Sequence, residues 1–207
     1  MSLDHVAMCV LFALVLLSIA LSLRVLAWVR QTDYVGQEAA EEWNPELEIG
    51  AAAPTFRAKL VDGTRVTERT FGGQHVAYVF LSPNCDSCRF TLPKVQEFAP
   101  AALERGTRLV VVTDTGIKQT AAWLDEALTD GALNTPVISA SLRESKMVQT
   151  YDGPGFFPYY CFVDAAGIVR GRGLLGSEEW MALTEAWAGR GELPFPHSGA
   201  GALADAR

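Results

Sequence analysis

Hydrophobic residues are distributed unevenly along the chain and divide it into four parts. An almost uninterrupted apolar run at residues 6–29 predicts a transmembrane helix, so residues 1–30 are expected to be a membrane anchor. The polar and acidic residues 31–49 have no sustained apolar period and predict a linker. Short apolar runs recur through residues 50–189, which we expect to form one folded domain. Gly, Pro and Ala dominate residues 190–207, where we expect a disordered tail.

Within the expected domain, apolar runs of strand length alternate with amphipathic stretches of helical period. The first two runs flank an Asp62-Gly63 turn and therefore predict a β-hairpin. The expected strands are residues 57–60, 65–67, 75–81, 109–113, 137–139, 159–163 and 168–172. The expected helices are one that begins at the cysteines near residue 85 and three more at residues 118–128, 141–151 and 177–188. This order predicts an α/β fold, a central mixed β-sheet flanked by helices on both faces, with an N-terminal hairpin extension.

A Cys-x-x-Cys pair, Cys85 and Cys88, stands where a buried strand gives way to a helix. The unpaired amides and the dipole at a helix N-terminus stabilise a thiolate, which is the nucleophile in thiol–disulfide exchange. Cys85 is therefore the expected attacking thiol. Cys88 lies one turn further into the helix, where it can close a disulfide with Cys85 and release a trapped substrate. A buried helix face follows, formed by Cys88, Leu92, Val95, Ala99 and Ala102, with Pro93 expected to kink the helix.

Charge and composition exclude several other functions. The net charge of −7, with no cluster of Lys or Arg, argues against a nucleic-acid partner. The three histidines, His5, His75 and His197, are not spaced as metal ligands, so no metal site is expected. The expected chemistry thus needs no cofactor beyond a redox-active disulfide between Cys85 and Cys88. The other two cysteines, Cys9 and Cys161, each stand alone in apolar runs.

The orientation of the expected anchor is open to two interpretations. Arg24 and Arg30 both follow the core of the apolar run, and the positive-inside tendency would place the domain in the cytoplasm. A cleaved signal peptide is a further alternative, but Asp4 and His5 stand where such a peptide carries Lys or Arg. We expect an uncleaved, single-pass anchor.

Several linked features resemble the thioredoxin superfamily. Pro93 lies eight residues after Cys85, as in the kinked active-site helix of thioredoxins, and Phe157-Pro158 directly precedes an expected strand. The resemblance implies that Pro158 is a cis proline whose loop contacts the disulfide and, with Phe157, binds the substrate. It also implies a thioredoxin-like fold. The Gly-x-x-Ala-Pro-x-Phe opening at residues 50–56 is similar to the redoxin branch that includes the membrane-tethered TlpA and ResA reductases.

Within that branch, the chain resembles the methylamine-utilisation accessory proteins called MauD in three segments, residues 27–31, 80–88 and 173–180. This likeness implies a thiol–disulfide oxidoreductase that forms or corrects disulfides in methylamine dehydrogenase, with its redox domain on the extracytoplasmic side and a membrane electron donor. A TlpA-like or ResA-like reductant for cytochrome c or copper-protein assembly would use the same residues. A redox-inert binding module with a thioredoxin fold is the alternative from another class.

The sequence also departs from the thioredoxin pattern. Val79 stands six positions before Cys85, where thioredoxin keeps a buried carboxylate, so the group that exchanges protons with Cys88 is left open between Asp86, water and another residue. Asp86 is expected to oppose ionisation of Cys85, which favours a reductase or isomerase over a strong oxidant. A peroxiredoxin is disfavoured, because Tyr78 and Ser82 occupy the Pro and Thr positions of the usual Pro-x-x-x-Thr-x-x-Cys motif.

Overall fold

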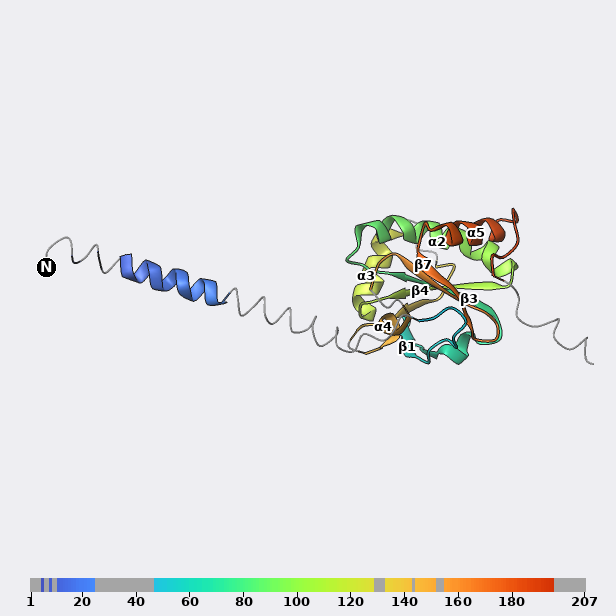
Figure 1. The fold of residues 1–207 in the computed structure, drawn as a ribbon, viewed down its shortest axis with the longest axis horizontal. Helices are drawn as coiled ribbons and strands as arrows, with labels where there is room; N and C mark the ends of the chain where they lie inside the picture. Colours follow the sequence, from blue (N-terminus) through green and yellow to red (C-terminus); the bar gives the residue numbers. More distant parts are fainter. Residues whose placement is uncertain are drawn as a thin grey trace, which may run out of the picture. The chain divides into compact units, whose positions relative to one another are not determined.

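The computed structural model describes residues 5, 8, 11–24, 47–128, 133–142, 144–151 and 155–195. The chain divides into two compact units, Met1–Trp43 and Asn44–Arg207. In the first unit, residues 11–24 are helical, and this helix is drawn in blue in Figure 1. None of the helices in the described parts of the chain combines the length and the apolar character that crossing a membrane requires. Parts of the expected anchor and nearly all of the expected linker lie outside the described residues.

Seven strands in the described part of the second unit form one mixed sheet, in the order β2-β1-β5-β4-β3-β6-β7 (Figure 1). Its centre is parallel, because β3 pairs with β4 and β4 pairs with β5 in the same direction, whereas β1, β2, β6 and β7 pair antiparallel. The strands are β1 Arg57–Leu60, β2 Arg65–Thr67, β3 His75–Leu81, β4 Thr107–Thr113, β5 Val137–Ser139, β6 Tyr159–Val163 and β7 Val169–Leu174.

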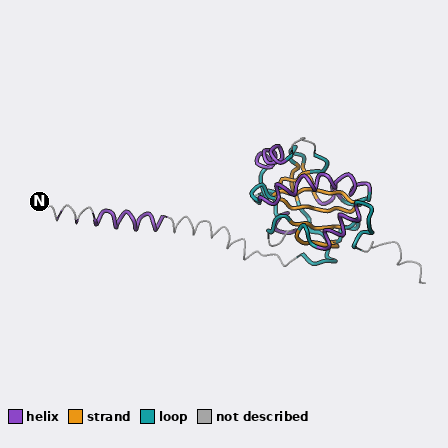
Figure 2. Tube along the Cα trace, turned by 90° about the horizontal axis from the view of Figure 1, so that it is seen from above, coloured by secondary structure: helices purple, strands orange, loops and turns teal. Residues whose placement is uncertain are grey.

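Helices cover both faces of this sheet, as the alternation of strands and helices predicts (Figure 2). Side chains of α2 Asp86–Glu104, α3 Ile117–Ala127 and α5 Glu178–Trp187 join one core cluster. Side chains of α4 Met147–Tyr151 and the 3-10 helix η1 Glu68–Phe71 join a second cluster with the alternate residues of the same strands. The large apolar side chains buried in such clusters each contribute about 1.5–3 kcal/mol to folding. The expected thioredoxin-like α/β fold is confirmed.

Some element boundaries differ from those expected. Among the described residues of the expected helix at 141–151, the helical ones are Met147–Tyr151, and the Ser145 hydroxyl accepts a hydrogen bond from the Met147 N–H at the start of this helix. The sequence pattern did not predict η1, which begins with a capping box between Thr67 and Thr70. Strand β4 begins two residues earlier than expected, because parallel pairing with β3 extends back to His75 and Thr107.

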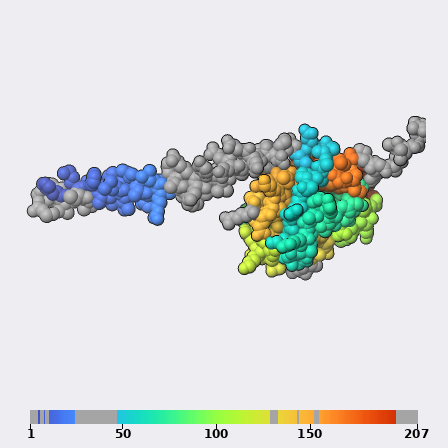
Figure 3. Space-filling view, turned by 90° about the horizontal axis from the view of Figure 1, so that it is seen from below, coloured from blue at the N-terminus to red at the C-terminus, as the bar shows by residue number. Residues whose placement is uncertain are grey.

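The N-terminal hairpin and α4 lie on the same face of the second unit. Figure 3 shows the hairpin residues, cyan to teal, beside residues near 140–150 in gold. The Tyr151 hydroxyl donates a hydrogen bond of 2.6 Å to the Pro54 carbonyl, which ties the start of the domain to α4.

The start of the expected tail packs against the core. Leu193 and Phe195 contact the first core cluster, and the Phe195 ring lies 5.0 Å from the Phe162 ring, centroid to centroid. Gly171 makes room for this contact, because a Cβ atom there would lie 2.1 Å from the Phe195 ring. The folded part therefore extends beyond the expected boundary at residue 189. Residues 196–207 lie outside the described residues.

Candidate active site

Strand β3 delivers Cys85 to the N-terminus of α2. The strand is buried along almost its whole length and ends at Leu81, and the Cys85 N–H then donates to the Ser82 carbonyl at 3.1 Å. This turn makes Cys85 the N-cap residue of α2, in extended backbone conformation. N-cap side chains accept hydrogen bonds from the first turn of a helix, so the thiol sulfur lies where free amides can stabilise a negative charge.

Two neighbours in the first turn of α2 bind the Cys85 sulfur. The Cys88 backbone N–H donates to Sγ at 3.3 Å, and the Ser87 hydroxyl lies 3.1 Å from the same atom. Partial burial raises the pKa of the Cys85 thiol, but hydrogen bonds from Cys88 and Ser87 outweigh it and hold the pKa below the ordinary cysteine value. Cys85 is also partly accessible to solvent, which a nucleophile needs.

Cys88 occupies the opposite environment. Its side chain has no exposed surface and packs in the first core cluster, on the buried face of α2. Burial raises the pKa of Cys88 to about 12, and the hydrogen bond with Cys85 and the charge of Asp114 act in the same direction. At neutral pH, Cys88 is therefore a protonated thiol behind a more acidic one, and both cysteines are free.

The loop before β6 closes over the attacking sulfur. The Phe157-Pro158 peptide bond is cis, as the thioredoxin resemblance implies. The Cys85 thiol donates a hydrogen bond of 3.7 Å to the Phe157 carbonyl, and the Phe157 side chain packs against both core clusters. The fold thus brings Cys85, Cys88, Phe157 and Pro158 to one place. Asp86 is exposed in the first turn of α2, directly after Cys85.

Two polar residues that the sequence interpretation did not assign to the site lie at the same edge of the sheet. Strands β3 and β4 pair in parallel up to Leu81 and Thr113, so the next residues, Ser82 and Asp114, also lie beside each other. The Ser82 hydroxyl donates to Asp114 Oδ2 at 3.1 Å. The sequence could have indicated Asp114 as a site residue, because it directly follows an expected buried strand and functional groups gather at the carboxyl ends of parallel strands.

The different environments of Cys85 and Cys88 suit the two steps of disulfide exchange, attack and resolution. A partly exposed thiol with a lowered pKa can attack a disulfide, and a buried, protonated thiol one helical turn away can resolve the product. Cys161 cannot take part, because it is buried in the second core cluster on the other face of the sheet. Burial also raises the pKa of Cys161 to about 12.

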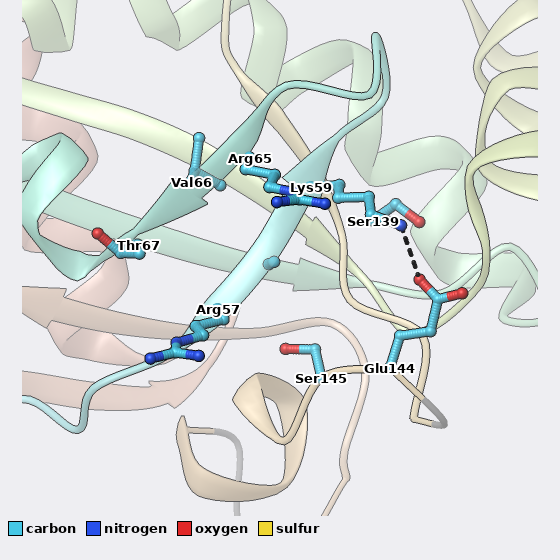
Figure 4. Close-up of a pocket in the computed structure, with 9 residues that line it drawn as sticks. Arg57, Lys59, Arg65, Val66, Thr67, Ser139, Glu144 and Ser145 are labelled. Carbon is cyan, nitrogen blue, oxygen red and sulfur yellow. Dashed lines mark ion pairs between the residues drawn. The ribbon is translucent and has the colours of Figure 1, made fainter.

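A separate pocket of about 620 Å³ lies between the N-terminal hairpin and the segment after β5 (Figure 4). Three cationic side chains, Arg57, Lys59 and Arg65, line it, and Lys59 forms an ion pair of 3.5 Å with Glu144. None of the site residues named above lines this pocket. Within the described residues, no group of three or more His, Cys, Asp or Glu side chains is arranged to hold a metal ion.

Comparisons with known proteins agree with this architecture. The family model of the AhpC/TSA family matches residues 49–172. None of the curated protein sequences matches the chain significantly.

Many solved structures are similar to the chain, among them the following three. The thioredoxin domain of a thiol-disulfide oxidoreductase from Bacteroides vulgatus has a TM-score of 0.51 at 20% identity, covering 61% of this chain and 89% of that one. A protein assigned as the thiol:disulfide interchange protein DsbE from Chlorobium tepidum has a TM-score of 0.56 at 18% identity, covering 69% and 99%. A yeast mitochondrial 1-Cys peroxiredoxin has a TM-score of 0.54 at 14% identity, covering 61% and 67%. At these identities the similarity establishes the thioredoxin-like fold.

Proposed function

This chain belongs to the AhpC/TSA family, and on that basis we propose that it is a thiol–disulfide oxidoreductase in which Cys85 attacks and Cys88 resolves. One observation carries the proposal: the Cys85 sulfur is partly exposed and receives hydrogen bonds from Cys88 and Ser87, whereas Cys88 is buried directly behind it. The Phe157 carbonyl lies 3.7 Å from the Cys85 sulfur, which supports pairing of this loop with the backbone of a client polypeptide, as the thioredoxin resemblance implies. Phe157 and Pro158 are accordingly the proposed substrate-binding residues.

The proposed reaction has two steps. The Cys85 thiolate attacks a client disulfide and forms a mixed disulfide, while one client sulfur leaves with the electron pair. Cys88 then attacks the Cys85 sulfur, so that the Cys85–Cys88 disulfide forms and the second client sulfur leaves as a thiol. The client is reduced by two electrons and the enzyme is oxidised by two. An external dithiol reductant must restore the free cysteines.

Trapping tests this assignment of roles. In a Cys88→Ser variant the first step proceeds and the second cannot, so a mixed disulfide with the client should accumulate and be released by reductant. In a Cys85→Ser variant we expect no mixed disulfide and no reduction of insulin disulfides. Cys161→Ala is the matched control, because that cysteine is buried on the other face of the sheet and should be dispensable. Full biological activity of the Cys85→Ser variant would instead support the redox-inert binding module.

A peroxidase is the second candidate, because the family match and the fold similarity to a peroxiredoxin both favour it. Two features of the site oppose it: Tyr78 and Ser82 replace the Pro and Thr of the usual peroxidatic motif, and the resolving thiol lies only three residues from the attacking one. Consumption of hydrogen peroxide by the reduced protein, at a rate exceeding its reduction of insulin, would establish the peroxidase.

We further propose that the protein works as a reductase or isomerase. This proposal rests on the acidic residue Asp86 directly after Cys85 in the chain, since a carboxylate beside a thiol disfavours a strongly oxidising disulfide; the hydrogen bonds from Cys88 and Ser87, which lower the Cys85 pKa, act in the opposite direction. The potential of the Cys85–Cys88 pair is measured by equilibration with glutathione. A potential as high as that of strong oxidants, about −120 mV, would contradict this direction of electron flow.

The likeness to MauD in residues 27–31, 80–88 and 173–180 supports methylamine dehydrogenase as the client, and the TlpA-like reductant of cytochrome c or copper proteins remains the runner-up. The apolar composition of residues 6–29, and the apolar side chains exposed on the helix at residues 11–24, support a membrane anchor. The proposed position of the redox domain outside the cytoplasm rests on the MauD likeness, whereas Arg24 and Arg30 favour the opposite orientation. The client trapped by the Cys88→Ser variant identifies both the substrate and its compartment. Resistance of the protein to alkaline extraction from membranes tests the anchor.

A further inference from the structure

The polar pair Ser82–Asp114 adjoins the active-site turn, with Ser82 buried and Asp114 half-buried. Ser82 is the first residue after β3 and is 3% exposed, and it begins the turn that leads to Cys85. Its hydroxyl has two roles, since it accepts from the Asn84 N–H at 3.2 Å and donates to Asp114 Oδ2 at 3.1 Å. Parallel pairing of β3 with β4 therefore brings a carboxylate to the active-site turn from a strand 32 residues further along the chain.

One oxygen of Asp114 is left unused by this arrangement. Oδ1 is buried and has no hydrogen-bond partner among the described residues, although buried carboxylate oxygens are normally satisfied. An unsatisfied buried polar atom is costly and often marks a functional role. Burial raises the pKa of Asp114, whereas the Ser82 hydroxyl opposes this rise, so the group can take up a proton more readily than an exposed aspartate.

Cys88 is a thiol that needs a proton acceptor. It is fully buried, its pKa is raised, and it must ionise before it can attack the mixed disulfide at Cys85. Ser82 connects Asp114 to the active-site turn, because its hydroxyl donates to Asp114 and its carbonyl accepts from the Cys85 N–H at 3.1 Å. Asp114 also acts electrostatically on Cys88.

We propose that Asp114, held by Ser82 at the end of β4, accepts the proton of Cys88 during resolution of the mixed disulfide and then passes it to the leaving client sulfur. This inference rests on the proposed thiol–disulfide exchange. The Cys88 proton passes to Asp114 Oδ1, directly or through one water, and the Cys88 sulfur attacks Cys85. The Cys85–client bond breaks, the electron pair leaves on the client sulfur, and the proton on Asp114 neutralises that sulfur.

Other titratable groups on the surrounding elements fit this role less well. Cys85 is the other group that acts electrostatically on Cys88, but its sulfur is bonded to the client at this stage. Asp86 on α2 and Lys118 on α3 are both exposed, and Lys118 carries no acceptor in its charged form. Tyr159 at the start of β6 is buried and has another partner.

The test uses the reduced full-length protein and the aromatic disulfide dithiobis(nitrobenzoate). Attack by Cys85 releases a first thionitrobenzoate in a bimolecular phase, and attack by Cys88 releases a second in a unimolecular phase. Thionitrobenzoate leaves as a stable anion, so the pH profile of the second phase reports only the deprotonation of Cys88. A Cys88→Ser variant, which lacks the second phase, identifies it.

An Asp114→Asn variant is expected to slow the second phase at neutral pH by roughly 10²-fold, the lower end of what general-base assistance contributes. Its rate should then rise continuously with pH, without the inflection of the unmodified protein, while the first phase changes less than about twofold. Asp125→Asn is the matched control, since this exposed aspartate on α3 faces solvent and should leave both phases unchanged. A purely structural role of Asp114 would lower the melting temperature but keep the inflection.

Ser82→Ala is the second variant, and it keeps the proposal testable if Asp114→Asn does not fold. Removing the hydroxyl that lowers the pKa of Asp114 should move the inflection to higher pH. An unaltered pH profile in either folded variant, or loss of the inflection in Asp86→Asn instead, would overturn the role of Asp114. Absence of the second phase from the unmodified protein would mean that Cys88 does not resolve, which is a failure of the proposed function and not of this inference.

Discussion

At the scale of single residues, the protonation of Cys85 depends on groups within one helical turn. The Ser87 hydroxyl lies 3.1 Å from the sulfur and helps to lower the pKa of Cys85. A Ser87→Ala variant should therefore have a higher Cys85 pKa. Since a hydrogen bond of this kind contributes about 0.5–1.5 kcal/mol, alkylation of Cys85 at a pH below its pKa should slow by roughly two- to tenfold.

The control for this prediction removes a hydroxyl from the same helix. The Thr91 hydroxyl donates to the Ser87 carbonyl at 2.8 Å, on the backbone side of Ser87 and not at its hydroxyl. Thr91→Ala should therefore leave the pH profile of Cys85 alkylation unchanged. Equal profiles for Ser87→Ala and the unmodified protein would show that the Cys88 N–H and the helix terminus alone set the acidity of Cys85.

At the scale of elements, Asp164 stabilises the C-terminal hairpin of β6 and β7 through its side-chain hydrogen bonds. Asp164 Oδ1 accepts hydrogen bonds of 2.9 Å from the N–H groups of Ala166 and Ile168, and Oδ2 accepts from Arg170 Nε at 2.7 Å. The side chain is buried, so Asp164→Ala leaves Arg170 and two amides without an acceptor. Loss of a buried, hydrogen-bonded charge partner should lower the free energy of unfolding by about 3 kcal/mol, measured by urea denaturation.

The N-terminal hairpin provides a matched comparison. Asp62 accepts from the Thr64 N–H at 2.8 Å in the same way, but this turn is exposed to solvent. Asp62→Ala should therefore cost much less stability.

Burial raises the pKa of Asp164, but hydrogen bonds from Ile168 and Arg170 outweigh it and hold the pKa below the ordinary value of 3.8. Its stabilisation is thus present above that pH and is lost as the pH falls below it.

At the scale of the whole molecule, the two-sided core makes the protein sensitive to alkali. Burial raises the pKa of Cys88, Cys161 and Tyr160 to about 12 in each case. In the unfolded chain the two thiols ionise near pH 9.0, so above that pH the folded state holds more protons than the unfolded one. Stability is therefore complete below about pH 9 and should fall as the pH rises towards 12.

Urea denaturation of the reduced protein as a function of pH checks the expected loss of stability between pH 9 and 12. A Cys161→Ala variant removes one of the buried thiols, so its midpoint should fall less steeply across that range than the midpoint of the unmodified protein. An identical slope in the two proteins would mean that Cys161 does not contribute. The comparison of slopes is independent of any loss of packing, because such a loss lowers the midpoint at every pH.

Local sequence patterns were sufficient for most of the fold. Strands β1, β2, β3, β5 and β6 have the bounds that the apolar runs predicted, and α3 and α5 differ from prediction by one residue at each end. These elements are specified by neighbours in the chain, through alternation, helical period and caps such as Ser177. The bounds of β4 and β7 differ from prediction by one or two residues. The larger errors fell at η1, at the N-terminal half of the helix expected at residues 141–151 and at the packed segment around Phe195, where contacts from distant parts of the chain decide the conformation.

The candidate site likewise contains residues that the local sequence predicted and residues that only the tertiary structure brings together. Cys85 and Cys88 are neighbours in sequence, so the strand-to-helix transition was enough to predict an attacking and a resolving thiol. The contact with Phe157 lies 72 residues away, and a family resemblance was needed to expect it. Asp114 was not identified at all, because its place beside Ser82 follows from the register of two parallel strands. Local periodicity specifies which residues are buried on an element, whereas the pairing of strands decides which buried groups share a site.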